Sequence, residues 1–199
     1  MNIVEAAHER KVLGRRFRVL SEQVSQLIPP ESSVLDIGCG SGDIDKLILE
    51  RRKDVTISGI DVLVRQDTAI EVTEYDGSTL PCDDNSYDAV IFVDVLHHTD
   101  NIERLLAEAG RVAGKCVILK DHTMEGLFSK ARLNFMDRVG NRRFGVNLTY
   151  NYYTKKQWLE AFEKVGLAVD VWNTKLDLYP WPFSMVFDSG LHFVARLTC

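Results

Sequence analysis

The first residues with a recognisable chemical use are the glycines of the segment Gly38-Cys-Gly-Ser-Gly42. They follow a short apolar run, Ser33 to Ile37, and precede apolar residues at helical spacing. A strand, glycine turn and helix in this order let the backbone approach a ligand at the carboxyl end of a parallel sheet. Asp61 ends the next apolar run, 19 residues after Gly42, where a carboxylate can accept hydrogen bonds from both hydroxyls of a ribose. The pattern predicts a binding site for a nucleoside-containing ligand.

Aspartates recur at or just beyond the ends of the predicted strands: Asp36, Asp61, Asp76, Asp94 and Asp121. Because parallel strands end at one edge of a sheet, these side chains are expected to gather there. Asp43 and Asp45 lie in the first turn of the helix after the glycines, where they would repel the pyrophosphate of a dinucleotide. The row therefore favours a cationic ligand without phosphate. Two other interpretations are aspartates that merely end strands and cap helices, and a magnesium cluster, although no phosphate-binding lysine loop accompanies it.

The elements that must position these residues alternate along the chain. Apolar residues at a spacing of three and four predict a helix or helix pair from Val4 to Ile28, which Pro29-Pro30 ends. Further strands are predicted at 55–60, 69–74, 89–93 and 115–119, with a helix at 102–112. Strands of continuous apolar residues that alternate with helices predict an α/β fold with a doubly wound, mainly parallel sheet. A helix at 155–164 and strands at 167–171 and 191–197 predict an antiparallel pair at its edge.

The composition is that of an ordinary globular domain. The 199 residues include 24 basic and 29 acidic side chains, a net charge of −5, and 45% hydrophobic residues. No apolar run is long enough to span a bilayer, and no signal peptide is visible. The four cysteines form no CxxC pair, so we expect reduced thiols, a cytoplasmic protein and no metal site. Mild acidity makes a nucleic-acid partner a minority expectation.

The ordered motifs resemble those of a known family. Val34-Leu-Asp-Ile-Gly-Cys-Gly-Ser-Gly42, Ile60-Asp61, Tyr75-Asp-Gly-Ser78, Leu80-Pro81 and the run from Tyr87 to His98 are similar to class I S-adenosylmethionine-dependent methyltransferases of the small-molecule type 11 group. The match covers about residues 31 to 122. It implies S-adenosylmethionine as the cofactor and a Rossmann-like, seven-stranded sheet with an antiparallel C-terminal edge strand. The cationic sulfonium and ammonium of this cofactor agree with the carboxylates.

The resemblance also implies roles for individual residues. Gly38 and Gly40, with Asp36 nearby, would hold the methionine end of the cofactor, and Cys39 would be a small filler in the turn. Asp61 would bind the ribose, with Val62 also in the cofactor site. Asp76 and Gly77 would meet the adenine, and Asp94 and Val95 would line the methyl-bearing side.

Histidines follow the strands that end nearest the transferred methyl group. His97 and His98 follow the fourth predicted strand, and His122 follows the fifth. A histidine can remove the proton of a hydroxyl or amine acceptor, so His98 and His122 are the candidate catalytic residues. The alternative is that they only shape the pocket, because displacement at a sulfonium depends mainly on positioning.

We expect one methyltransferase domain over residues 1–199, with an N-terminal helical segment at 1–30 and an insertion at 123–153. From 126 to 156 the chain has seven basic residues and one acidic residue, which suggests a lid over the acceptor; a solvated amphipathic helix is the alternative. The expected reaction is methyl transfer to a small apolar or aromatic acceptor. A NAD-dependent oxidoreductase and a non-catalytic cofactor-binding module are the alternatives. No motif after Thr123 assigns a particular acceptor, and none indicates an oligomeric state.

Overall fold

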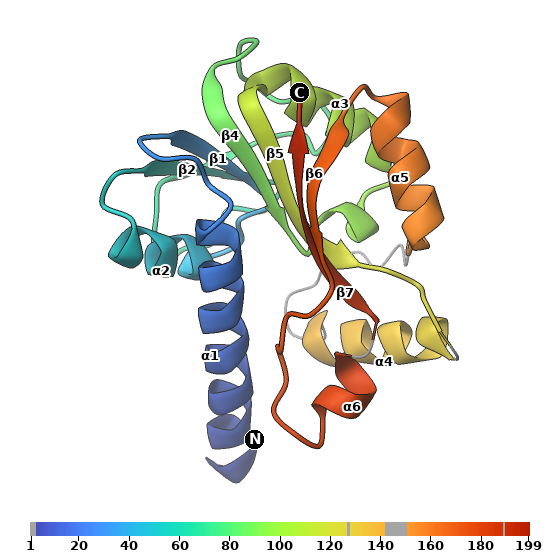
Figure 1. The fold of residues 1–199 in the computed structure, drawn as a ribbon. Helices are drawn as coiled ribbons and strands as arrows, with labels where there is room; N and C mark the ends of the chain where they lie inside the picture. Colours follow the sequence, from blue (N-terminus) through green and yellow to red (C-terminus); the bar gives the residue numbers. More distant parts are fainter. Residues whose placement is uncertain (1–2, 127, 142–150, 189) are drawn as a thin grey trace.

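The computed structural model describes residues 3–126, 128–141, 151–188 and 190–199 (Figure 1). Within them, seven strands form a sheet in the order β3-β2-β1-β4-β5-β7-β6. Their bounds are β1 Ser33–Ile37, β2 Thr56–Asp61, β3 Val72–Glu74, β4 Tyr87–Val93, β5 Ala113–His122, β6 Ala168–Asn173 and β7 His192–Thr198. Strands β1 to β5 pair in parallel, whereas β7 is antiparallel to both β5 and β6. The predicted α/β fold is confirmed, and the expected antiparallel C-terminal strand is β7, which lies between β5 and the edge strand β6.

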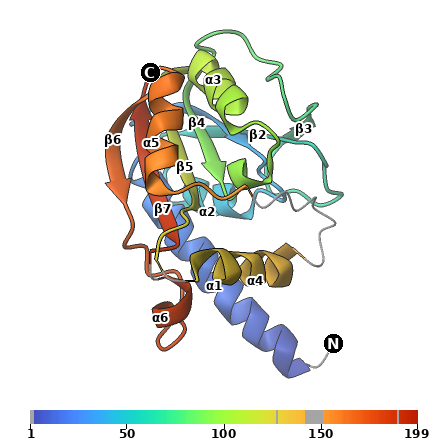
Figure 2. The ribbon, with the colours of Figure 1, turned by 90° about the vertical axis from the view of Figure 1, so that its right-hand side faces the viewer.

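Helices cover both faces of the sheet (Figures 1 and 2). Their bounds are α1 Ile3–Ser25, α2 Asp43–Arg51, α3 Ile102–Val112, α4 Ser129–Asn141, α5 Lys155–Lys164 and α6 Ser184–Phe187, with a 3₁₀ turn η1 at Leu96–His98. Alternate residues of one strand supply the two cores: Leu35 packs in the cluster that contains α3 and α5, and Val34 in the cluster that contains α2 and the end of α1. The sequence allowed a pair of helices before Pro29, and the structure has the single helix α1.

Local capping explains why two helices begin where the sequence predicts. The side chain of Asn101 accepts a hydrogen bond from the Arg104 N–H at the start of α3. Thr154 and Gln157 form a capping box at the start of α5. Both helices have the predicted bounds. By contrast, β3 retains only the last three residues of the run predicted as a strand, consistent with its place at the edge of the sheet.

The insertion predicted at 123–153 contains α4, which lies beyond the carboxyl ends of β4 and β5 (Figures 1 and 2). Helix α6 lies beside α4: the Arg132 side chain donates a hydrogen bond to the carbonyl of Val186, and the rings of Phe135 and Phe187 stack at 6.4 Å. The part of the predicted lid at 127 and 142–150 lies outside the described residues. Among the helices of the described chain, none is both long and apolar enough to cross a membrane.

Candidate functional site

The glycine turn lies at the carboxyl end of β1 and is tied to β2. The Gly38 N–H donates to the carbonyl of Ile60 at 2.7 Å, and the Gly42 N–H donates to the carbonyl of Cys39 at 2.9 Å. Gly38, Gly40 and Gly42 have φ angles of 74°, 61° and 71°, in the region that glycine occupies without strain. A Cβ at Gly38 would lie 2.6 Å from Val95 Cγ2. Only glycine fits at position 38, because the Val95 side chain after β4 packs directly against its backbone. The turn therefore exposes backbone without side chains at the carboxyl end of β1, where a ligand can approach closely.

Asp61 connects the end of β2 to this turn. One carboxylate oxygen accepts the Gly40 N–H at 2.8 Å, and the other accepts the Leu63 N–H at 3.0 Å. Each carboxylate oxygen can accept more than one hydrogen bond, so both keep a lone pair for further donors. The structure thus brings Asp61 to the glycine turn in an orientation that leaves capacity for two ribose hydroxyls.

Two buried carboxyl groups lie beneath the turn. Asp36 on β1 and Asp45 on α2 are 3% and 0% exposed. Apart from the hydrogen bond that the two carboxyl groups share and the backbone of Asp45 itself, no described group donates to Asp36 Oδ1 or to either Asp45 oxygen. Burial, and then the neighbouring Asp45, raise the pKa of Asp36 well above its usual range, and burial raises the pKa of Asp45 to about 6. The pair is short of hydrogen-bond donors, which the ammonium of a ligand would supply.

Cys39, between these glycines, is a poor nucleophile in this setting. Burial raises the pKa of its thiol, and the nearby Asp36 and Asp45 raise it further, so the reactive thiolate is disfavoured. Its sulfur packs against Gly59, where a Cβ would lie only 2.5 Å away. This placement agrees with the expected role as a filler.

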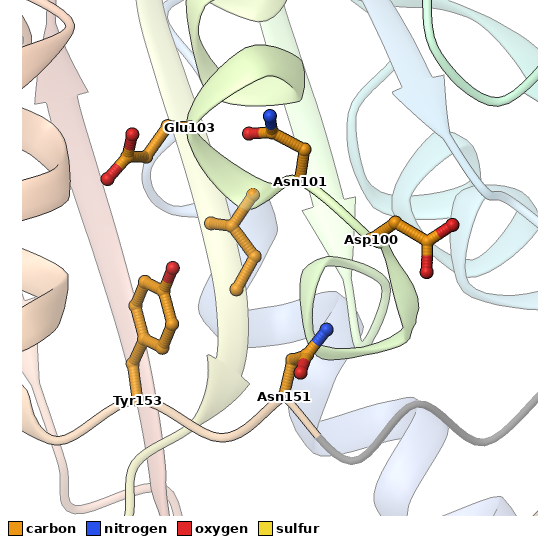
Figure 3. A pocket seen from close by; sticks show the side chains of 6 residues that line it. Asp100, Asn101, Glu103, Asn151 and Tyr153 are labelled. Carbon is orange, nitrogen blue, oxygen red and sulfur yellow. The ribbon is translucent and has the colours of Figure 1, made fainter.

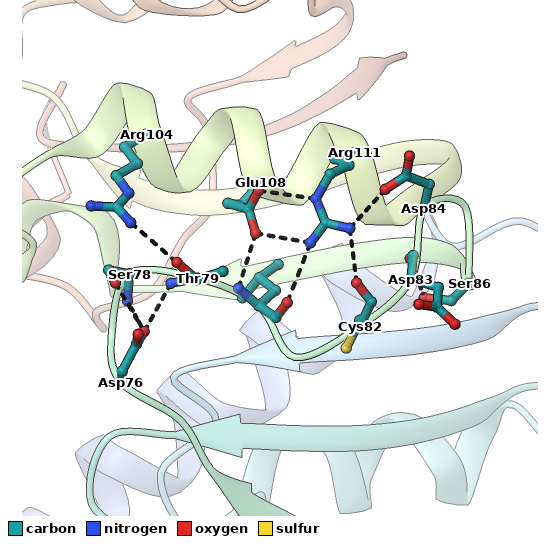
Figure 4. Close-up of polar contacts among 11 residues, drawn as sticks. Asp76, Ser78, Thr79, Cys82, Asp83, Asp84, Ser86, Arg104, Glu108 and Arg111 are labelled. Atoms are coloured by element: carbon teal, nitrogen blue, oxygen red, sulfur yellow. Dashed lines mark hydrogen bonds and ion pairs between the residues drawn. The ribbon is translucent and has the colours of Figure 1, made fainter.

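The expected adenine side is formed by the loops after β2 and β3. Asp76 Oδ1 accepts hydrogen bonds from the Ser78 and Thr79 N–H groups, at 2.7 and 2.8 Å, and these bonds lower the pKa of Asp76 (Figure 4). Gly77 adopts a φ of 81°, and a Cβ there would lie 3.0 Å from Val62 Cγ1. Val62 is 56% exposed. An exposed apolar side chain therefore lies beside a polar turn, which suits a flat heterocycle with polar edges.

Helix α3 holds the loop that carries Asp76 (Figure 4). The Arg111 guanidinium donates to the carboxylate of Glu108 at 2.9 and 3.0 Å, and to the carbonyls of Leu80 and Cys82 at 3.2 and 2.8 Å. Glu108 in turn accepts the Leu80 N–H at 3.0 Å. These bonds fix the chain between β3 and β4 to α3, so the polar turn at Asp76 has a defined position.

Asp94 follows β4 in a left-handed conformation, with a φ of 61°. Its carboxylate accepts short hydrogen bonds from Arg16 on α1 and from Lys120 on β5, and the Lys120 side chain is completely buried. Although burial acts to raise the pKa of Asp94, these two cations hold it well below its usual range. The charge of Asp94 is already neutralised, so it differs from the free carboxylate that the row of aspartates suggests.

The candidate histidines lie together, with His97 between them. The His97 ring is 4.0 Å from the His98 ring and 4.6 Å from the His122 ring, measured between centroids. His97 Nδ1 forms a 2.6 Å hydrogen bond with Asp121 Oδ1, and both residues are buried. Burial, and then Lys120, lower the pKa of His122 to about 4, so its ring is neutral at pH 7. His98 is only half-buried.

Three contributors to this region were not identified from the sequence: Arg16, Lys120 and His192. Lys120 lies within a run of buried strand residues, and Arg16 is 78 residues from Asp94. No local pattern links residues so far apart, whereas the position of Asp121 at a strand end beside His122 was a usable signal.

A surface pocket of about 250 Å³ lies at the start of α3 (Figure 3). It is lined by Asp100, Asn101, Ile102, Glu103, Asn151 and Tyr153. The Asn151 N–H donates to the carbonyl of His97 at 3.2 Å, and its side chain donates to the carbonyl of Thr99 at 2.8 Å. The pocket includes no residue of the glycine turn, but its Asn151 fastens the chain before α5 to η1.

Comparisons with known proteins agree with this geometry. A family model described as "Methyltransferase domain" matches residues 12–170. The chain is 31% identical over 155 residues to a bifunctional methionine biosynthesis protein, MetXA/MetW, of Rhodopirellula baltica; the match covers 64% of this chain and 25% of that protein. The chain thus spans about a quarter of the length of this curated relative.

Solved structures share the fold at low sequence identity. One is a putative methyltransferase in complex with the Trm112 methyltransferase activator of Haloferax volcanii, with a TM-score of 0.69 and 14% identity over 96% of this chain and 93% of that chain. Another is a possible histamine N-methyltransferase of Thermotoga maritima, with a TM-score of 0.64 and 21% identity over 98% of this chain and 95% of that chain.

Proposed function

Because the chain belongs to the class I S-adenosylmethionine-dependent methyltransferases of the small-molecule type, we propose that its acceptor is a small apolar or aromatic molecule. The observation that carries this proposal is the group of aromatic rings beyond Asp94 and Val95. His97, His122 and Tyr152 have ring centroids 4.6 to 6.0 Å apart, and all three are buried. A lining of this kind favours a small, flat acceptor over an extended polymer.

S-adenosylmethionine is the cofactor, and it supplies an electrophilic methyl group on a good leaving group. Four sets of residues in this chain would contact it. Asp36 and Asp45 would accept hydrogen bonds from the ammonium of the cofactor, because their buried oxygens have few other donors. Asp61 would accept the two ribose hydroxyls, and Val62 with Gly77 would face the adenine. Gly38 and Gly40 would present backbone to the methionine portion.

The acceptor must lose a proton if its attacking atom is a hydroxyl oxygen or a protonated amine. His98 is the better placed of the two candidate bases, because its side chain is only half-buried. Its backbone N–H donates to the carbonyl of Val95 at 2.9 Å, and the Val95 side chain lies against Gly38 of the glycine turn. His122, with a pKa near 4, holds a proton weakly at neutral pH and is better suited to lining the pocket. Positioning by these rings would supply much of the rate enhancement.

A NAD-dependent oxidoreductase and a non-catalytic cofactor-binding module would behave differently from a methyltransferase. A dinucleotide would place its pyrophosphate beside Asp43 and Asp45, which disfavours a NAD-dependent oxidoreductase. A non-catalytic module would bind the cofactor without turnover.

Methyl-labelled S-adenosylmethionine and a fractionated cell extract would test the acceptor class. We expect label in the fraction of small molecules, and a His98→Asn variant should lower that rate by about 10²- to 10⁴-fold if the acceptor needs a base. Asp100→Asn, two residues away and exposed, is the matched control. Label only in protein or nucleic acid would refute the proposed acceptor class, and cofactor binding without any transfer would favour the non-catalytic module.

A further inference from the structure

A buried group of metal-binding side chains lies at the ends of β4 and β5. His97 comes from η1, and Asp121 and His122 are the last two residues of β5. Asp121 Oδ1 is 2.6 Å from His97 Nδ1 and 3.6 Å from His122 Nδ1. One potential ligand atom from each residue lies within 4.8 Å of the other two, and each residue is at most 3% exposed. Three donors from two elements thus converge on one point.

The hydrogen-bonding of this group is incomplete. Among the described residues, His122 Nδ1 has no hydrogen-bond partner, and neither ring nitrogen of His192 has one. His192 pairs with His122 across β5 and β7, and their ring centroids are 4.8 Å apart. Buried polar groups are nearly always satisfied, so two adjacent buried imidazoles with unused nitrogens indicate a missing partner.

The group offers nitrogen and oxygen donors in surroundings whose charges cancel. Arg16 and Lys120 are balanced by Asp94 and Asp121, so the ionised side chains around the group sum to zero. The immediate donors are two imidazoles and one carboxylate. This set selects first-row transition ions such as Zn²⁺, whereas Mg²⁺ and Ca²⁺ prefer oxygen ligands.

We propose that His97, Asp121 and His122 bind one divalent transition metal ion of the Zn²⁺ type. Binding would replace the hydrogen bond between His97 and Asp121, and the neutral His97 ring would take the tautomer that carries its proton on Nε2, which leaves Nδ1 for the ion. Metal–ligand bonds of about 2.0–2.2 Å impose donor separations of about 3–3.5 Å, so the 2.6 Å contact between His97 and Asp121 would widen while the 3.6 Å separation between Asp121 and His122 would change little. The ion would join η1 to β5.

Titration of the full-length, chelator-treated chain with Zn²⁺, without S-adenosylmethionine, tests this site independently of the proposed acceptor. We expect one ion per chain, a rise in Tm, and visible absorption from tetrahedral or five-coordinate Co²⁺ in the wild-type protein. His97→Ala and His122→Ala should each weaken Zn²⁺ binding by more than about 100-fold. His98→Ala, which removes a neighbouring ring outside the group, should leave Zn²⁺ binding unchanged.

Circular dichroism would establish that each variant is folded. If the wild-type chain binds no Zn²⁺ and gives no Co²⁺ spectrum, or if folded His97→Ala and His122→Ala bind as tightly as wild type, the proposal is wrong. In that case His97 and Asp121 form only a buried hydrogen-bonded pair.

Discussion

At the residue scale, Asp61 illustrates how one side chain can serve both the fold and the ligand. Its two oxygens already accept the N–H groups of Gly40 and Leu63, so it shapes the glycine turn before any cofactor arrives. The same oxygens are the expected acceptors for the ribose. Loss of this carboxylate should therefore weaken binding by a direct and an indirect route.

The Asp61→Ala substitution should lower the affinity for S-adenosylhomocysteine by about 10- to 150-fold, which corresponds to about 1.5–3 kcal/mol for charge-assisted hydrogen bonds. Isothermal titration calorimetry would measure it. Glu74→Ala is the matched control, because Glu74 is exposed and pairs with Asp61 in the register of β2 and β3. Unchanged affinity in folded Asp61→Ala would mean that Asp61 does not bind the ribose.

The Asp36–Asp45 pair predicts an unusual pH dependence of stability. The pKa of Asp45 is about 6 in the folded protein against 3.8 ordinarily, so the folded state keeps this proton more strongly than the unfolded state. The stabilising contribution of the protonated Asp45 carboxyl is therefore present below pH 3.8 and is lost as the pH rises through about 6.

Asp45→Asn should remove this loss and stabilise the empty protein at pH 7 by about 1–3 kcal/mol. Urea denaturation between pH 4.5 and 8 would measure the free energy of unfolding, with Asp43→Asn, an exposed neighbour on α2, as the control. If Asp45→Asn is no more stable than wild type at pH 7, ionisation of the buried Asp45 carboxyl does not destabilise the protein.

At the element scale, most of the fold was predictable because its signals are local. Helices α3 and α5 match their predicted bounds, since each has a capping residue and an apolar face that the sequence displays. The site was predictable only in part. The strand-end aspartates do share one edge, but Asp94 and Asp121 are occupied by Arg16, Lys120 and His97. Those partners come from distant elements, and no periodicity encodes such pairings.

Helix α4 buries few of its described apolar side chains. Among its described side chains Leu133 is completely buried, whereas Phe135 is 58% exposed, and the preceding Phe128 is 80% exposed. A segment with so little buried apolar surface is expected to open easily. If it covers the acceptor, as the basic segment in the sequence suggests, ligand binding should stabilise it.

Hydrogen exchange across residues 129–141 should accordingly be fast in the empty protein and slower with S-adenosylhomocysteine bound. Peptides from α5, which carries the buried Trp158 and Phe162, provide the internal reference. Slow exchange in the empty protein that does not change on binding would identify α4 as ordinary packed structure.

At the scale of the whole molecule, the sheet brings distant residues to one edge. Arg16, Asp94, Lys120 and His192 span most of the chain, yet they converge where β4 and β5 end and β7 begins. The glycine turn and its carboxyl pair lie beside this cluster, at the end of β1, which is the neighbour of β4. The strand order therefore makes the expected cofactor site and the proposed acceptor region neighbours.

Calorimetric titration of the full chain with S-adenosylhomocysteine and, separately, with NAD would show which class of ligand the glycine turn and its carboxyl groups bind. The buried carboxyl pair of Asp36 and Asp45 and the carboxylate of Asp61 should give S-adenosylhomocysteine a single site with micromolar affinity. NAD, whose pyrophosphate would meet the carboxylates of α2, should bind far more weakly. Equal or tighter binding of NAD, or no binding of S-adenosylhomocysteine, would contradict the account.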